Sequence, residues 1–491
     1  MSLKKFVLHY SHFFTGSALS LMLGLVSFPI FTRILTREEY GIVGLLATTM
    51  FLAVAVGKAG LSDGIVRFYS KYSETEEDLE LFSSTVLFRG VVLSTVVALL
   101  YLSIVFSIGV ITGTEMKYRE CYLIMTAYLW IRPLNIIVLN ILRVKGKTVF
   151  YNVLNLVGRA SAIIGSLTLM LYVFRSFYGY FVGLVAAELI VGILLFAWFF
   201  STHKFNLSKV SWPLTSQLLK FGAPLLITEF SYLLLTYADR YLIVMFKGAA
   251  DLGVYSVGYN LASYISDMIM FSLSYAVIPI YVAIFDKEGK EKTEEFLSKC
   301  AHYILIAIIP VFFGYMAISK NLFLLLASEK YVSAASFSPV ILLGSLIIGM
   351  NNIFNAGLYL KKKSKLILGI MLFTLAINVA LNILLLPEYG VLGSAVATLV
   401  SAIISSVATV YYSFKHIVVR ISLYDLLYYT AASAIMYSVV TLSLFDLPTL
   451  WAGLLLQIFA GALIMIPFFA FKERELVAKI RSMSFLKGSS V

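Results

Sequence analysis

Apolar runs of about 20 residues recur along the whole sequence and are separated by short polar turns. A helix rises about 1.5 Å per residue, so a run of this length crosses the ~30 Å hydrocarbon layer of a membrane. Hydrophobic residues make up 60% of the 491 residues and charged residues only 13%. The alternating segments of membrane β-barrels are not seen. The sequence therefore predicts an all-α, polytopic membrane protein.

The breaks between the apolar runs predict about fourteen transmembrane helices. The loops between these helices are short, so no soluble domain is inserted. The predicted helices span residues 12–34, 40–66, 82–110, 120–142, 149–174, 177–200, 216–243, 252–283, 296–318, 334–359, 364–386, 391–414, 424–445 and 449–471.

Lysine and arginine are unevenly distributed over the predicted loops. With both termini on the same side, 25 basic residues lie on that side and nine on the other. Cytoplasmic loops carry the excess of basic residues, so both termini are predicted to be cytoplasmic. The net charge of +12 then reflects topology and contact with anionic membrane lipids, and no nucleic-acid partner is expected. We expect the protein to work as a monomer.

Short motifs recur at a nearly constant spacing, which suggests a duplication. The run Glu39-Tyr40-Gly41-Ile42 matches Asp251-Leu252-Gly253-Val254, and Tyr178-Gly179 returns as Tyr389-Gly390. We predict an N-terminal six-helix lobe at 1–211 and a C-terminal six-helix lobe at 212–420, related as parallel repeats. Residues 421–491 would add two transmembrane helices and a basic cytoplasmic tail. The alternative is that such short matches arise by chance among membrane helices.

Motifs for common catalytic chemistry are missing from the sequence. No phosphate-binding glycine loop, zinc-protease His-Glu-x-x-His or nucleophile-elbow Gly-x-Ser-x-Gly is present. The two cysteines, Cys121 and Cys300, lie far apart, which disfavours a disulfide or a metal site. We therefore expect neither an enzyme nor a bound cofactor.

Two helices just after the middle of the chain carry polar stripes. In each helix the polar residues recur at helical spacing and share one face. A polar face on a membrane helix has to meet protein or water instead of lipid. The stripes are Glu229, Tyr232, Thr236 and Asp239 on the first helix, and Ser256, Asn260, Ser263, Asp267 and Ser274 on the second.

Several short motifs resemble those of polysaccharide-biosynthesis flippases of the O-antigen type, in the multidrug/oligosaccharidyl-lipid/polysaccharide exporter superfamily. The resemblance covers nearly the whole chain. It implies two six-helix lobes around a central cavity, and flipping of an undecaprenyl-diphosphate-linked oligosaccharide across the cytoplasmic (inner) membrane, with polysaccharide polymerase or assembly proteins as partners. The motifs are Phe28-Pro29-Ile30-Phe31-Thr32-Arg33-Ile34-Leu35-Thr36, Glu39-Tyr40-Gly41, Gly60-Leu61, Arg67-Phe68-Tyr69, Asp239-Arg240 and Leu386-Pro387-Glu388-Tyr389-Gly390-Val391-Leu392-Gly393.

Ionisable side chains inside membrane helices are costly unless they are paired or hydrated, so each one calls for a reason. Basic side chains suit the oxygens of a diphosphate, and carboxylates can bind H⁺ or Na⁺ as the coupling ion. The candidate substrate-binding residues are Lys58, Arg132, Arg159 and Arg89. The candidate ion-coupling residues are Glu229, Asp267, Glu188 and Asp239.

Structural alternatives remain for these residues. Lys58 and Arg89 lie near helix ends, where a long basic side chain can reach the membrane surface. Arg159 and Glu188 are predicted at similar depth and could pair with each other. Glu229 and Asp267 could form hydrogen bonds between helices without any coupling role.

Two other functions compete with the flippase. One is a multidrug antiporter of the same superfamily, driven by Na⁺ or H⁺, for which a cationic N-terminal half is unfavourable. The other is a membrane glycosyltransferase or glycan polymerase, for which we would expect a large outer loop that the sequence lacks.

The topology can be tested with reporter fusions. Fusions at residues 116, 248 and 329 should report the outer side, and fusions at 75, 205, 290 and 363 the cytoplasm, because basic residues concentrate around the second set. A phosphatase reporter and a fluorescent reporter at each position give opposite readouts. Inversion of every position after one helix would contradict the helix count.

Overall fold

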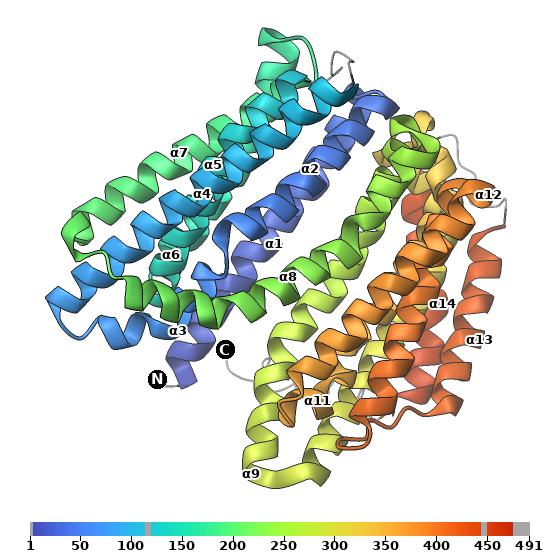
Figure 1. Cartoon of the computed structure of the whole chain (residues 1–491). Coiled ribbons are helices and arrows are strands. Elements are labelled where there is room, and N and C mark those ends of the chain that lie inside the picture. Colours follow the sequence, from blue (N-terminus) through green and yellow to red (C-terminus); the bar gives the residue numbers. More distant parts are fainter. Residues whose placement is uncertain (1–2, 113–118, 443–448, 475–491) are drawn as a thin grey trace, which may run out of the picture. The chain divides into compact units, whose positions relative to one another are not determined.

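The computed structural model describes residues 3–112, 119–442 and 449–474 (Figure 1). The last predicted residues of helix 424–445, and most of the predicted basic tail, lie outside these ranges. The chain divides into two compact units, which meet in the sequence between Gly253 and Val254. In the described ranges all regular elements are helical, so the predicted all-α class is confirmed.

Among its described residues, the N-terminal unit contains the eight α-helices α1 to α8. Thr36 caps α2 in a reciprocal pair of hydrogen bonds with Glu39, which is a strong start signal for a helix. The helices are α1 (Leu3–Ile34), α2 (Arg37–Lys58), α3 (Leu61–Tyr72), α4 (Glu76–Thr112), α5 (Arg119–Val144), α6 (Thr148–Thr168, continued by a π-helical turn over Leu169–Val173), α7 (Tyr178–Thr202) and α8 (Trp212–Lys247); a 3₁₀ turn covers Leu207–Lys209.

Two glycines divide long helices in the C-terminal unit. Gly289 and Gly390 have φ of 84° and 58°, a left-handed conformation that glycine adopts without a steric cost. Each of α9 and α12 therefore contains two helices. The elements are α9 (Ala249–Leu326), a 3₁₀ helix (Glu329–Ser336), α10 (Ser338–Phe354), α11 (Ala356–Leu360), α12 (Ser364–Ser413), α13 (Leu423–Val440) and α14 (Leu450–Lys472).

Each of the fourteen predicted helices has a counterpart in the structure, although some boundaries differ. Ten of the described helices are long and apolar enough to cross a membrane. The predicted helix 40–66 is broken at Ala59 and Gly60, and helix 334–359 is broken at Asn355. The predicted boundary between the halves lies after residue 211, which assigns α8 to the C-terminal half. In the structure α8 packs against α2 and α3 and falls within the N-terminal unit. The duplication itself stays a prediction.

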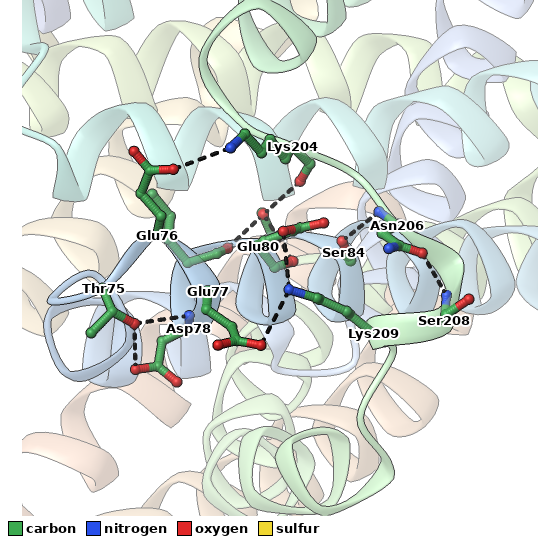
Figure 2. A network of polar contacts seen from close by, with 12 residues as sticks. Thr75, Glu76, Glu77, Asp78, Glu80, Ser84, Lys204, Asn206, Ser208 and Lys209 are labelled. Carbon is green, nitrogen blue, oxygen red and sulfur yellow. Dashed lines mark hydrogen bonds and ion pairs between the residues drawn. The ribbon is translucent and has the colours of Figure 1, made fainter.

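A polar network joins the beginning of α4 to the linker between α7 and α8 (Figure 2). Lys204 lies 3.1 Å from Glu76, and Lys209 lies 3.2 Å from Glu80. The hydrogen bond from Lys209 to Glu80 raises the pKa of the lysine above its ordinary value. The backbone N–H of Asn206 also donates to Ser84. This network fixes the position from which α8 starts.

A second polar cluster joins the two C-terminal helices to the second half of α9. The ring of His302 lies 3.3 Å from Asp425 of α13 and 3.1 Å from Glu473, the residue after α14. Lys472 lies 2.7 Å from Asp425. The cluster therefore connects three helices at one end of the C-terminal unit.

Candidate functional site

The site begins at the break between α2 and α3. Lys58 is the last residue of α2, a position where the helix dipole favours a cation. Ala59 and Gly60 follow with φ of 45° and 71°, and α3 starts again at Leu61. Gly60 is in close contact with Gly222 of α8, because a Cβ added to either glycine would overlap the backbone of the other. The α8 backbone therefore passes directly beside the break.

Glu229 lies seven residues after Gly222, which is two turns along the same face of α8. Its Oε1 is 2.6 Å from Nζ of Lys58. The side chain of Lys58 is 15% exposed and that of Glu229 is 37% exposed. Burial makes either charge costly alone, so the pair offsets a cost that each partner would otherwise carry. The glycine contact thus positions a half-buried ion pair.

Asp63 completes this charged group and was missed by the sequence analysis. It lies in the first turn of α3, half-buried, and interacts electrostatically with both Lys58 and Glu229. When all three side chains are ionised, the group carries one positive and two negative charges. Asp63 could have been selected from the sequence as an acidic residue inside an otherwise apolar run.

Further contacts hold α2 and α8 together beyond the ion pair. Phe51 stacks on Tyr237 with ring centroids 5.6 Å apart, and Arg240 donates to Thr48 over 3.0 Å. A Cβ on Gly41 would overlap the carbonyl of Ala249, just after α8. These contacts extend from Gly60 and Gly222 at one end to Gly41 and Ala249 at the other. Asp239, a predicted coupling residue, is buried on α8 in the same region.

A second ion pair connects α5 and α7. Arg132 donates to Glu188 over 2.9 Å, and Asn135 donates to the other carboxylate oxygen of Glu188 over 2.8 Å. Asn135 also donates to the backbone carbonyl of Glu188 over 2.9 Å. The alternative of a pair between Arg159 and Glu188 is wrong among the described residues, because Glu188 is held by α5 instead.

The two remaining arginines have different surroundings. Arg89 of α4 donates to Thr215 over 3.1 Å and lies 5.1 Å from the ring of Trp212, so it contacts the first turn of α8. Arg159 is exposed on α6 and forms no ion pair with any residue that the structure describes. Arg159 is therefore the more available cation of the two.

The second polar stripe lies on α9 in the C-terminal unit. Ser256 is buried, Asn260 is half-buried and Asp267 is exposed, so the predicted stripe does not face a single environment. The side chain of Ser274 lies outside the described residues. The coupling role of Asp267 stays a prediction.

The contact between the two glycines can be tested by substitution. Gly222→Ala should lower Tm in detergent, because the added methyl overlaps backbone atoms, and overpacking costs about 1–3 kcal/mol. Gly369→Ala is the matched control, since a Cβ there meets open space and alanine favours the helix by up to ~1 kcal/mol. A Gly222→Ala variant as stable as the control would show that the helices are not in close contact.

Comparison with known families supports this description of the fold. The family model described as "Polysaccharide biosynthesis protein" matches residues 11–285, which is more than half of the chain. The MatE family model matches residues 224–384. The "Probable low-salt glycan biosynthesis flippase Agl15" of Haloferax volcanii is 22% identical over 286 residues. That match spans 57% of this chain and 59% of the relative's length.

Solved structures show the same fold at low sequence identity. The lipid II flippase MurJ, in an inward closed conformation, matches with a TM-score of 0.77 and 18% identity over 96% of this chain and 100% of its own. An inward-facing multidrug resistance MATE family transporter matches with a TM-score of 0.65 and 14% identity over 81% of this chain and 95% of its own. Ten of the described helices are long and apolar enough to cross a membrane, and the family model matches more than half of the chain. The chain therefore belongs to the polysaccharide biosynthesis protein family.

Proposed function

We propose that the protein flips a lipid-linked oligosaccharide, carried on undecaprenyl diphosphate, from the inner to the outer leaflet of the cytoplasmic membrane. The observation that carries the proposal is the set of four basic side chains inside helices of the N-terminal unit. Such side chains suit an anionic headgroup that has to enter a low-dielectric region. The similarity to Agl15, whose name describes a glycan biosynthesis flippase, supports the same substrate class.

The four basic side chains differ in their exposure and in the partners that their charged groups already have. Arg159 is exposed, and the ion-pair partner of Lys58 is itself 37% exposed, so both can reach a ligand. Arg132 and Arg89 already use their guanidinium groups on Glu188 and Thr215. We assign Lys58 and Arg159 to the diphosphate, with Arg132 and Arg89 contributing charge from a greater distance.

Replacement of these cations tests the proposal. Lys58→Ala and Arg159→Ala should each reduce surface glycan at least about tenfold, the effect of losing roughly 1.4 kcal/mol of binding. Membrane abundance should stay near the wild-type level, because Arg159 has no described ion-pair partner and the Glu229 carboxylate left by Lys58→Ala is 37% exposed and can be hydrated. Arg159→Lys should restore little if the guanidinium binds two phosphate oxygens, because an ammonium cannot form that fork. Surface glycan is measured by labelling intact cells.

Lys365→Ala is the matched control, because Lys365 is an exposed basic residue near the start of α12. Arg132→Ala should instead lower abundance as well as export, since it leaves the carboxylate of Glu188 without its cation. Normal export by both Lys58→Ala and Arg159→Ala would rule out recognition through these cations.

We further propose that transport is coupled to an H⁺ or Na⁺ gradient. The sequence has no phosphate-binding glycine loop for ATP, and moving a charged headgroup outward needs a source of free energy. A ligand shifts a conformational equilibrium only by its difference in affinity for the two states. Glu229, which is half-exposed beside Lys58, and Asp267, which is exposed on α9, are the carboxylates best placed to exchange an ion. Glu188 and Asp239 are more enclosed, so we place them second in this role.

Flipping in proteoliposomes tests the coupling. Glu229→Gln and Asp267→Asn should fold and still bind substrate, but flipping should no longer respond to an imposed H⁺ or Na⁺ gradient, because an amide cannot release or bind the ion as a carboxylate does. Glu295→Gln is the matched control, since Glu295 only pairs with exposed lysines. A wild-type gradient response in both variants would place the coupling site elsewhere.

A multidrug cation antiporter is the second candidate function. The MatE match over residues 224–384 and the similarity to a multidrug resistance transporter favour it. An exposed Arg159 would repel a cationic drug, which favours the anionic substrate instead. Efflux of a cationic dye that depends on Asp267, with surface glycan unchanged, would favour the antiporter.

A further inference from the structure

The two ion pairs of the N-terminal unit differ in how firmly they are held. Glu188 accepts bonds from Arg132 and Asn135 on its two carboxylate oxygens, and its side chain is only 13% exposed. Within the described ranges, Glu229 accepts one ion-pair hydrogen bond, from Lys58, and its side chain is 37% exposed. The first pair is a structural brace between α5 and α7. The second pair can exchange its anion with little loss of packing.

The position of Glu229 also suits exchange. Pro224 lies between Gly222 and Glu229, and it removes a backbone hydrogen bond from the interior of α8. Figure 1 shows that α8 bends along its length, as helices do at proline. The part of α8 before Pro224 is fixed by Gly60 and by the contact of Arg89 with Thr215. The segment with Glu229 can therefore adjust separately from that fixed part.

We propose that Glu229 occupies, in the empty protein, the place on Lys58 that the substrate diphosphate takes during transport, so that the two anions compete for one ammonium group. The inference rests on the proposed flippase function and adds an order of events to it. A diphosphate carries more negative charge than one carboxylate, so it binds Lys58 more strongly once it reaches the pair.

The exchange has a consequence for Glu229. The displaced carboxylate loses its cation and lies near both the diphosphate and Asp63, and all three groups are negative. It therefore moves away from Lys58 or takes up a cation. Substrate binding at Lys58 thus frees the carboxylate that we propose for ion coupling.

Binding measurements on purified protein in detergent test the exchange. The probe is undecaprenyl diphosphate, with undecaprenol as the control that lacks phosphate. Glu229→Gln should bind undecaprenyl diphosphate roughly tenfold more tightly than the wild type, about 1.4 kcal/mol, because the competing anion is gone. Inorganic pyrophosphate should compete with the lipid, and should do so at lower concentration in the same variant.

A double-mutant cycle separates competition from a general effect of charge. In a Lys58→Ala background the further change Glu229→Gln should give no gain in affinity, because the contested ammonium is absent. The double variant removes the ammonium and the Glu229 carboxylate together and leaves only the charge of Asp63, so its Tm in detergent is compared with that of the wild type before binding is measured. Asp63→Asn is the matched control: it removes a nearby negative charge but no ion-pair partner of Lys58, and it should give a smaller gain.

Carbodiimide labelling gives an independent readout, because the reagent reacts with accessible carboxyl groups. Undecaprenyl diphosphate should increase labelling of Glu229 in the wild type and leave Glu188 unchanged. If the wild type binds the lipid but Glu229→Gln binds it no more tightly, the exchange is wrong and the flippase proposal stands. If the wild type binds neither undecaprenyl diphosphate nor pyrophosphate, both proposals fail.

Discussion

The close approach of Gly60 and Gly222 is the contact on which the charged group depends. With no side chain between them, the backbones of α8 and of the α2–α3 break come into direct contact. Helices in membranes associate through such small residues, because lipid tails provide no hydrophobic force to drive them together. The contact brings Glu229 within ion-pair distance of Lys58, and Asp63 interacts electrostatically with both. A larger side chain at either glycine would separate groups whose interaction falls off with distance.

The helices were predictable because a single requirement determines them. A membrane helix has to bury about 20 apolar residues and satisfy its own backbone, so the length and hydropathy of each run are sufficient to find it. The broken helices were not predictable in the same way. Gly60 lies in an apolar run that reads as continuous, and the break depends on two consecutive left-handed residues and on the α8 backbone that fits against them.

The ion-pair partners of the charged residues could not be predicted, because the spacing of residues along the sequence does not determine which helices face each other. Arg159 and Glu188 are predicted at similar depth, yet Glu188 pairs with Arg132 of α5 in the structure. The sequence does not determine how each helix is rotated about its axis, and this rotation decides which arginine reaches the carboxylate. Asp63 shows the effect of the break directly. Five residues after Lys58 in a continuous helix, it would lie about 140° around the axis from the lysine. The helix is interrupted between the two residues, at Ala59 and Gly60, and Asp63 interacts electrostatically with Lys58.

The network between α4 and the linker before α8 has a consequence for how the chain is made. Glu76 and Glu80 leave the ribosome 128 and 129 residues before their partners Lys204 and Lys209. The acidic start of α4 therefore waits, without those partners, until α5, α6 and α7 have all entered the bilayer. Basic residues usually anchor a loop to the cytoplasmic side, and here the same two lysines also join it to a helix inserted long before. These ion pairs can therefore form only after the intervening helices have been made, and they join the linker before α8 to a helix synthesised much earlier.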